Sequence, residues 1–169
     1  MLIFLDIDGV MTSANSWKRP ELLSDGFAMF NSNATNALKK IIAKTNADII
    51  LTSSHKTNYS PQEWAVLFKS RGIQVADIQS LPENISRLSR KEEILNWITN
   101  NPEEDSFIII DDDKSLNDLP PSLKQKLILT SGSIGLTDEL AEKAIMLLKR
   151  KKASTRKNKV VSKSKKPAA

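Results

Sequence analysis

The stretch FLDIDGV, residues 4–10, places two aspartates directly after an apolar run. Residues 2–5, LIFL, have the composition of a short buried strand, and Asp6 and Asp8 follow it with one isoleucine between them. A carboxylate at the end of a buried strand loses hydration, so a compensating partner is expected nearby. In an extended chain, residues i and i+2 point the same way, which predicts that the two carboxylates serve one site.

Strand and helix patterns alternate outward from this stretch over one domain of ordinary size. Apolar runs predict further buried strands at 47–51, 107–110 and 126–130, with a short strand at 73–78. Helical patterns occur at 33–47, 60–72, 90–101 and 137–150. This order predicts an α/β fold, a three-layer Rossmann-like parallel sheet with helices on both faces.

Capping residues indicate where two of these helices begin. Ser60, Pro61 and Glu63 form a capping-box pattern at the start of the helix predicted over 60–72. Asn33 or Thr35 is the expected N-cap of the helix before it.

Composition excludes several classes of protein. The chain of 169 residues contains no cysteine, which rules out disulfides, thiolate catalysis and cysteine-based zinc sites. It has no apolar run near the ~18 residues that a membrane span requires, so no membrane partner is expected. The first residues, MLIFL, lack the basic region and cleavage site of a signal peptide. We therefore expect a cytoplasmic protein.

Charge is divided unevenly along the chain, whose net charge is +5. Residues 149–169 contain ten Lys or Arg and no acid, which leaves 15 basic residues against 20 acidic ones in residues 1–148. We expect a mildly acidic folded domain over 1–148 and a basic, disordered tail over 149–169. Because the tail lacks aromatic residues, the nucleic-acid binding expected of it is non-specific, through phosphates. A localisation signal and a solubilising extension are the alternatives.

Polar residues follow three of the predicted strands. Asp6 follows the first, TSSH (52–55) the second, and DDD (111–113) the strand at 107–110. Ligands of open parallel sheets bind beyond the carboxyl ends of the strands, so these residues are expected to meet. A cluster of carboxylates raises the pKa of each member unless a cation offsets the charge. All-oxygen ligands indicate Mg²⁺.

The same residues suit phosphoryl transfer. An aspartate can attack phosphorus to form an aspartyl-phosphate, and a second carboxyl group can protonate the leaving oxygen and later deprotonate water. Thr52 and Ser53 offer hydroxyls and amides to phosphoryl oxygens. Arg90 or Lys91, at the start of a predicted helix, offsets phosphoryl charge.

The motifs DIDGV, IILTSSH, SRKEEI and FIIIDDD resemble, in order and spacing, the four motifs of the haloacid dehalogenase-like (HAD) superfamily of phosphatases. The resemblance covers residues 1–148, which makes this segment the expected catalytic domain. It implies that Asp6 is the nucleophile and a metal ligand, and that Asp8 is the general acid/base with its backbone carbonyl on the metal. It implies Thr52 as the phosphate-binding hydroxyl, and Asp112 as the main fourth-motif metal ligand with Asp111 beside it.

RKEEILNWI, DDD and the terminal GLTDELAEKAIMLL are similar to a small capless branch of this superfamily, named for its occurrence in RNA-repair proteins. In that branch the third element is usually RGEEI, which favours Arg90 over Lys91 as the basic residue. The aromatic residue usual after the second motif's serines is replaced here by His55.

The intervals between the motifs leave no room for a sizeable cap domain. A helix and a short strand already fill most of residues 55–90. An uncapped site is open and can admit the end of a polymer. We therefore expect a Mg²⁺-dependent phosphatase acting on nucleic-acid ends or nucleotides. A phosphotransferase, and a non-catalytic nucleic-acid-binding protein with this fold, are the alternatives.

The tryptophans and the single histidine have alternative interpretations. Trp64 and Trp97 lie on amphipathic helices and are expected in the core. Trp17, in SANSWKRPE, lies near the expected mouth of the site, where ordinary packing is expected and stacking on a base is the alternative. His55 is either a loop residue or a substrate contact.

Overall fold

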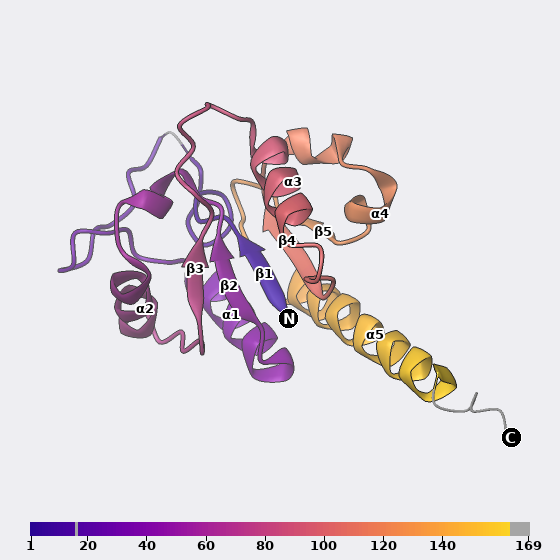
Figure 1. Cartoon of the computed structure of the whole chain (residues 1–169). Helices are drawn as coiled ribbons and strands as arrows, with labels where there is room; N and C mark the ends of the chain where they lie inside the picture. The colour runs from indigo at the N-terminus through magenta and orange to yellow at the C-terminus, as the bar shows by residue number, and fades with distance from the viewer. Residues whose placement is uncertain (16, 163–169) are drawn as a thin grey trace, which may run out of the picture.

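The computed structural model describes residues 1–15 and 17–162, and the side chains of residues 1–15 and 17–150. Five parallel strands form one sheet in the order β3-β2-β1-β4-β5 (Figure 1). The strands are β1 Leu2–Leu5, β2 Asp48–Leu51, β3 Ile78–Ser80, β4 Phe107–Asp111 and β5 Leu127–Leu129. The predicted Rossmann-like parallel sheet is confirmed.

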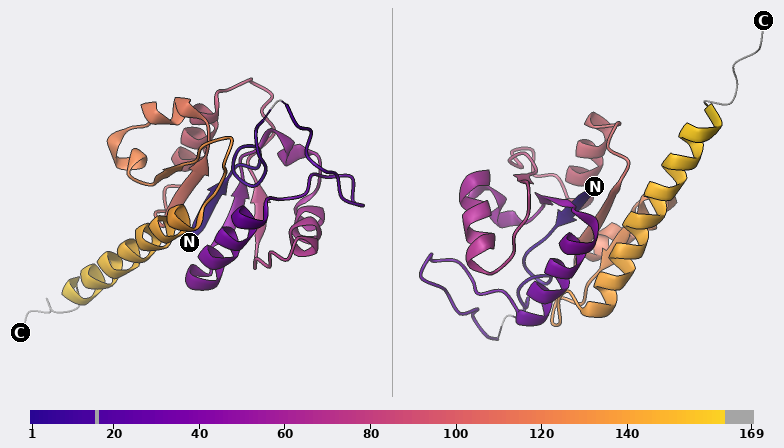
Figure 2. Two further views of the ribbon diagram at one scale, coloured as in Figure 1. Left: turned by 180° about the vertical axis from the view of Figure 1, so that it is seen from behind. Right: turned by 90° about the horizontal axis from the view of Figure 1, so that it is seen from below.

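Helices cover both faces of this sheet, as predicted (Figure 2). The α-helices are α1 Ser32–Thr45, α2 Pro61–Ser70, α3 Arg90–Asn100, α4 Pro121–Lys124 and α5 Asp138–Ser162. Two short 3₁₀ helices are η1 Ser54–Thr57 and η2 Lys114–Asp118. The apolar residues of α1, α2 and α5 form one buried cluster with the sheet, and those of α3, η2 and α4 form the other.

Side-chain alternation along the strands builds these two cores. In β1, Ile3 and Leu5 belong to the cluster with α1 and α5, whereas Phe4 faces α3. The Phe4 ring packs edge-on against Trp97 and Phe107, at centroid distances of 5.0 and 5.4 Å. A strand with apolar residues on both faces must be central, and β1 is the middle strand of the five.

Two local predictions are wrong in their position. The short strand lies at 78–80 instead of 73–78, because pairing with β2 begins only at Ile78. Ile73 instead belongs to the end of α2, where its amide donates to the Phe68 carbonyl at 3.0 Å. The N-cap of α1 is Asn31, whose side chain accepts from the Asn33 amide at 2.9 Å. The capping box at Ser60 is confirmed.

Helix α5 continues beyond the predicted end at residue 150, to Ser162. The backbone of residues 149–162, part of the segment predicted as a tail, is helical in the structure. Residues 163–169 lie outside the described part of the chain. The division into a catalytic domain over 1–148 and a basic tail stays a prediction.

The carboxyl ends of the strands carry no large cap domain in the described residues. The long connection from β1 to α1 is irregular apart from isolated bridges, among them Leu22 with Ala28. The predicted capless fold is confirmed for this part of the chain. Among its helices, none combines the length and hydrophobicity needed to cross a membrane.

Candidate active site

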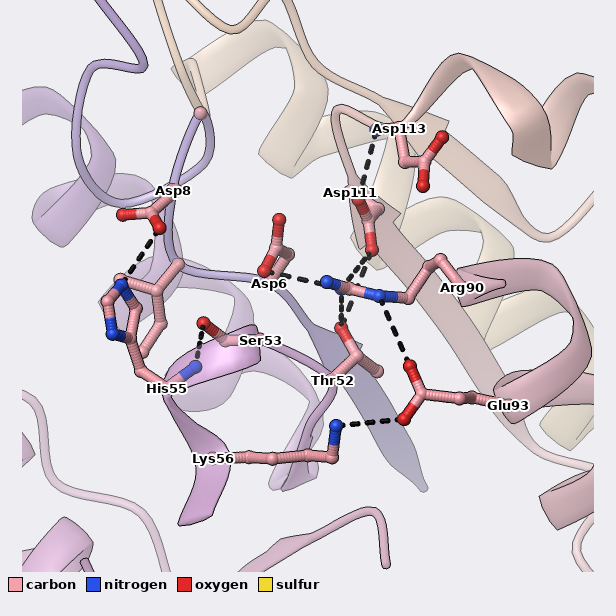
Figure 3. Close-up of polar contacts among 12 residues, drawn as sticks. Asp6, Asp8, Thr52, Ser53, His55, Lys56, Arg90, Glu93, Asp111 and Asp113 are labelled. Carbon is pink, nitrogen blue, oxygen red and sulfur yellow. Dashed lines mark hydrogen bonds and ion pairs between the residues drawn. The ribbon is translucent and has the colours of Figure 1, made fainter. Parts of the chain in front are cut away.

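The three strand ends that carry polar residues are neighbours in the sheet. Strand β1 pairs with β2 on one side and with β4 on the other. Asp6 follows β1, Thr52 follows β2, and Asp111 is the last residue of β4. Figure 3 shows their side chains gathered around the guanidinium group of Arg90. The predicted convergence at this edge is therefore present.

Three carboxylates could hold a metal ion here. Asp6, Asp111 and Asp112 each offer one oxygen, and these oxygens lie within 4.8 Å of one another. The Asp112 carboxylate fits closely between two glycines: a Cβ at Gly9 would overlap it, and a Cβ at Gly132 would lie 2.7 Å from its Oδ2. Gly9 also has a φ of +77°, a conformation that favours glycine. The donor set, all carboxylate oxygens, fits Mg²⁺.

The electrostatics of the cluster favour an added cation. Burial, together with the Asp6 carboxylate, raises the pKa of Asp111 to about 7, although Arg90 acts in the opposite direction. Burial likewise raises the pKa of Asp6, and burial and Asp6 together raise the pKa of Asp112. One arginine therefore offsets only part of the negative charge that the three acids carry when ionised.

Arg90 lies at the centre of the polar contacts. Its Nη1 donates to Asp111 Oδ2 and Thr52 Oγ1, both at 2.8 Å, and lies 3.3 Å from Asp6 Oδ1. Arg90 is the first residue of α3, directly after the N-cap Ser89. The neighbouring Lys91 forms no ion pair with these acids within the described residues. The structure thus brings Arg90, and not Lys91, into the site.

Asp8 lies apart from the three-carboxylate group. Its side chain is about half exposed, and its Oδ2 lies 2.9 Å from His55 Nε2. Thr12 Oγ1 donates to the other oxygen at 3.2 Å. Asp6 is by contrast buried, at 6% exposure. Figure 3 shows Asp8 turned toward His55, which suits a group that exchanges protons with solvent or substrate.

The two predicted hydroxyl residues differ in their surroundings. Thr52 is buried, contacts Arg90 directly, and lies 3.5 Å from Asp111 Oδ2. The Ser53 side chain is also buried, but its oxygen accepts from the His55 amide at 3.2 Å and thereby caps η1. Thr52 is thus placed beside the acids, whereas the Ser53 hydroxyl holds η1 in position.

A buried ion pair next to Arg90 was not predicted from the sequence. Lys56 Nζ donates to Glu93 Oε1 at 2.8 Å, with side-chain exposures of 5% and 10%. Glu93 Oε2 also lies 3.9 Å from Arg90 Nε. The i, i+3 spacing of Arg90 and Glu93 was a possible signal, but nothing local marks Lys56 as buried.

A polar pocket of about 390 Å³ opens beside these residues. Its lining includes Thr52 and Arg90 of the candidate site, together with Lys56, Glu93 and Asp113. The candidate site is therefore continuous with a space that can hold part of a ligand.

The structure distinguishes between the alternative interpretations of the three tryptophans and of His55. Trp64 is fully buried and Trp97 packs partly buried against Phe4, so both core predictions are confirmed. Trp17 is 95% exposed, so the expectation of ordinary packing was wrong: no neighbouring element covers its part of the irregular connection. His55 contacts Asp8 from η1.

Comparison with known protein families gives a match over most of the chain. A family model described as "HAD domain in Swiss Army Knife RNA repair proteins" matches residues 2–141. This range contains every residue of the candidate site. No curated protein and no solved structure gives a significant match to the chain.

Proposed function

The chain belongs to the family of HAD domains in Swiss Army Knife RNA repair proteins, and from this premise we propose that it is a Mg²⁺-dependent phosphatase working through an aspartyl-phosphate. The observation that carries the proposal is the group of Asp6, Asp111 and Asp112 beside Arg90. These residues combine a nucleophile, ligands for a cation and a positive charge for the phosphoryl group.

Asp6 is the proposed nucleophile. Its carboxylate oxygen attacks phosphorus, the bond from phosphorus to the leaving oxygen breaks, and Asp8 gives that oxygen a proton. A water molecule then attacks the aspartyl-phosphate, Asp8 accepts a proton from it, and the bond to Asp6 breaks to release phosphate. The contacts of Asp8 with His55 and Thr12 support this role because they hold its carboxylate at the open edge of the site.

Arg90 and Thr52 are the proposed phosphate-binding residues, together with the main chain at Ser53. Their mutual contact at 2.8 Å brings a guanidinium and a hydroxyl to the same point beside Asp6. Asp6, Asp111 and Asp112, with the backbone carbonyl of Asp8, would hold Mg²⁺, which offsets charge on the phosphoryl oxygens when bound.

The proposed substrates are phosphorylated nucleic-acid ends or nucleotides. The family description, which names RNA repair proteins, supports this class. The absence of a large cap over the described strand ends also supports it, since an open edge admits a polymer. A phosphotransferase would differ only in the molecule that accepts the phosphoryl group from the aspartyl-phosphate.

The cytoplasmic location stays a prediction.

The test is turnover of a generic aryl phosphate with and without Mg²⁺. Asp6→Asn should lower kcat by a factor on the order of 10⁴ or more, because the nucleophile is lost. Asp118→Asn, which removes an exposed carboxylate of η2, is the matched control and should leave turnover unchanged.

A second readout does not depend on activity. Mg²⁺ should raise the melting temperature of the wild-type protein, because ligand binding stabilises the folded state, and the rise should be lost in Asp112→Asn. If Mg²⁺ stabilises the protein but no phosphate ester is turned over, the non-catalytic binding protein is the better interpretation.

A further inference from the structure

An exposed tryptophan is followed directly by two cations near the candidate site. Residues 17–20, WKRP, are all exposed, and we call them the WKRP tip. Trp17 is 95% exposed, more than any other large apolar side chain in the described residues. Lys18 and Arg19 have no ion-pair partner within the described part of the chain. A fully exposed tryptophan followed by two cations, unpaired within the described residues, combines groups that can stack on a base and bind phosphates.

The chain just before the tip is fixed against the candidate site. The amide of Ala14 donates to the Gly132 carbonyl at 2.8 Å. A Cβ at Gly132 would lie 3.4 Å from Ala14 Cβ on one side and 2.7 Å from Asp112 Oδ2 on the other. Ala14 is therefore a near neighbour of the proposed metal ligand Asp112. Trp17 follows three residues later, within roughly 11 Å of Ala14 along the chain.

The chain just after the tip is fixed as well. The Met29 amide donates to the Glu21 carbonyl at 2.7 Å. Arg71 Nη2 donates to the Ala28 carbonyl at 2.9 Å, and its two terminal nitrogens bind the Asp25 carboxylate. These hydrogen bonds from Arg71, together with one from the Phe27 amide, lower the pKa of Asp25 to about 2, so the ion pair between Asp25 and Arg71 persists into acidic pH. The WKRP tip is thus presented from two anchored points.

The chemistry of the WKRP tip matches single-stranded nucleic acid. A tryptophan face stacks on any base, and base–aromatic stacking is tolerant of sequence. Lys18 and Arg19, next to the tryptophan in the chain, suit phosphates adjacent to a stacked base. Bases inside a duplex are already stacked, so the ligand must be a single strand or an unpaired end.

We propose that the WKRP tip binds the single strand whose phosphorylated end lies in the candidate active site. This inference rests on the proposed function, since it takes the end of the strand to be at Asp6. It adds to that function a specificity: a phosphorylated oligonucleotide is preferred over a mononucleotide, because only the longer ligand reaches both the acids and Trp17.

A membrane surface is the competing partner for such a tip, since tryptophan and cations also suit anionic lipid headgroups. The position of the tip favours the nucleic acid. Its preceding residues contact the loop that packs on Asp112, so a ligand at the tip can extend directly into the site.

The first experiment measures binding in the Asp6→Asn background, where the ligand is not consumed. A fluorescently labelled single strand of about ten nucleotides with a terminal phosphate is titrated by anisotropy. Adding Trp17→Ala should weaken binding roughly tenfold. Adding Ile85→Ala, which truncates an apolar side chain that is 81% exposed elsewhere, should leave binding unchanged. Lys18→Gln with Arg19→Gln should reduce the slope of log K against log salt by about 1.4.

The second experiment separates the tip from catalysis. In the otherwise wild-type protein, Trp17→Ala should raise KM for the phosphorylated oligonucleotide about tenfold and leave kcat/KM for an aryl phosphate unchanged. Equal oligonucleotide binding by the Trp17→Ala and Ile85→Ala variants would overturn the inference. It would also be overturned if Trp17→Ala abolished binding to anionic vesicles and left oligonucleotide binding unchanged. Neither result touches the proposed function, whose failure would appear as no turnover of the aryl phosphate by the wild-type protein.

Discussion

At the scale of single residues, Arg90 and Lys91 are adjacent in α3, but only Arg90 contacts the acids of the candidate site. Adjacent residues of an α-helix project about 100° apart, so only one of the two can face the strand ends. Arg90 contacts Asp6, Asp111 and Thr52. A planar guanidinium can contact two acids and a hydroxyl at once, which a lysine ammonium does less well.

Replacing Arg90 should therefore affect catalysis far more than replacing Lys91. Arg90→Ala is expected to lower kcat/KM for an aryl phosphate by about 10²- to 10³-fold, since a donor to the phosphoryl group is lost. Steady-state kinetics with Mg²⁺ measures the effect, and circular dichroism checks that the variant is folded. Lys91→Ala is the control and should retain activity; a larger loss in this control would assign the phosphate contact to Lys91.

At the scale of elements, the start of α3 is joined to η1 by a buried ion pair. The capping box of Ser89 and Glu92 sets where α3 begins and so where Arg90 stands. One turn later, Glu93 pairs with Lys56 of η1, and both side chains are almost completely buried. Breaking such a pair leaves one charge buried without compensation.

The variant Glu93→Ala should accordingly lower the free energy of unfolding by about 3–5 kcal/mol. Denaturant titration measures this loss. The double variant Glu93→Leu with Lys56→Met should recover most of the stability, because it removes both charges and keeps apolar volume. Glu103→Ala, at an exposed position, should change stability little. A loss in Glu93→Ala no greater than in the Glu103 control would show that the pair contributes little to the fold.

At the scale of the whole molecule, the helical part of the basic segment (residues 149–162) leads away from the candidate site. Figure 1 shows α5 running past the amino-terminal ends of the strands, away from the carboxyl ends of β1 and β4. Asp6 follows β1 and Asp111 ends β4 at those carboxyl ends. This helix has 25 residues, a length of about 37 Å. Only a long strand could therefore contact the basic segment and the acids together.

Removal of residues 151–169 should then act in a length-dependent way. For a single strand of about five nucleotides, KM should be unchanged, and for one of about forty it should rise and lose much of its salt dependence, because up to eight Lys or Arg are removed. Turnover of an aryl phosphate should stay the same. If the truncation raises KM equally for both strands, the basic segment must reach the active site itself.

Much of the fold was predictable because its signals are local. The apolar runs before Asp6, Thr52 and Asp111 predicted three buried strands, which the structure pairs side by side. The capping box at Ser60 predicted the start of α2. Strand β3 was misplaced because a three-residue edge strand is defined by its pairing with β2 and carries little periodicity of its own.

The sequence by itself determined the α/β sheet, the family and the acids that could meet, because periodicity and motif spacing are properties of the linear chain. Only the tertiary structure decided which of these residues touch. It selected Arg90, paired His55 with Asp8, buried Lys56 against Glu93 and left Trp17 exposed. Each of these results depends on how segments far apart in the chain pack in space, and no local pattern encodes that packing.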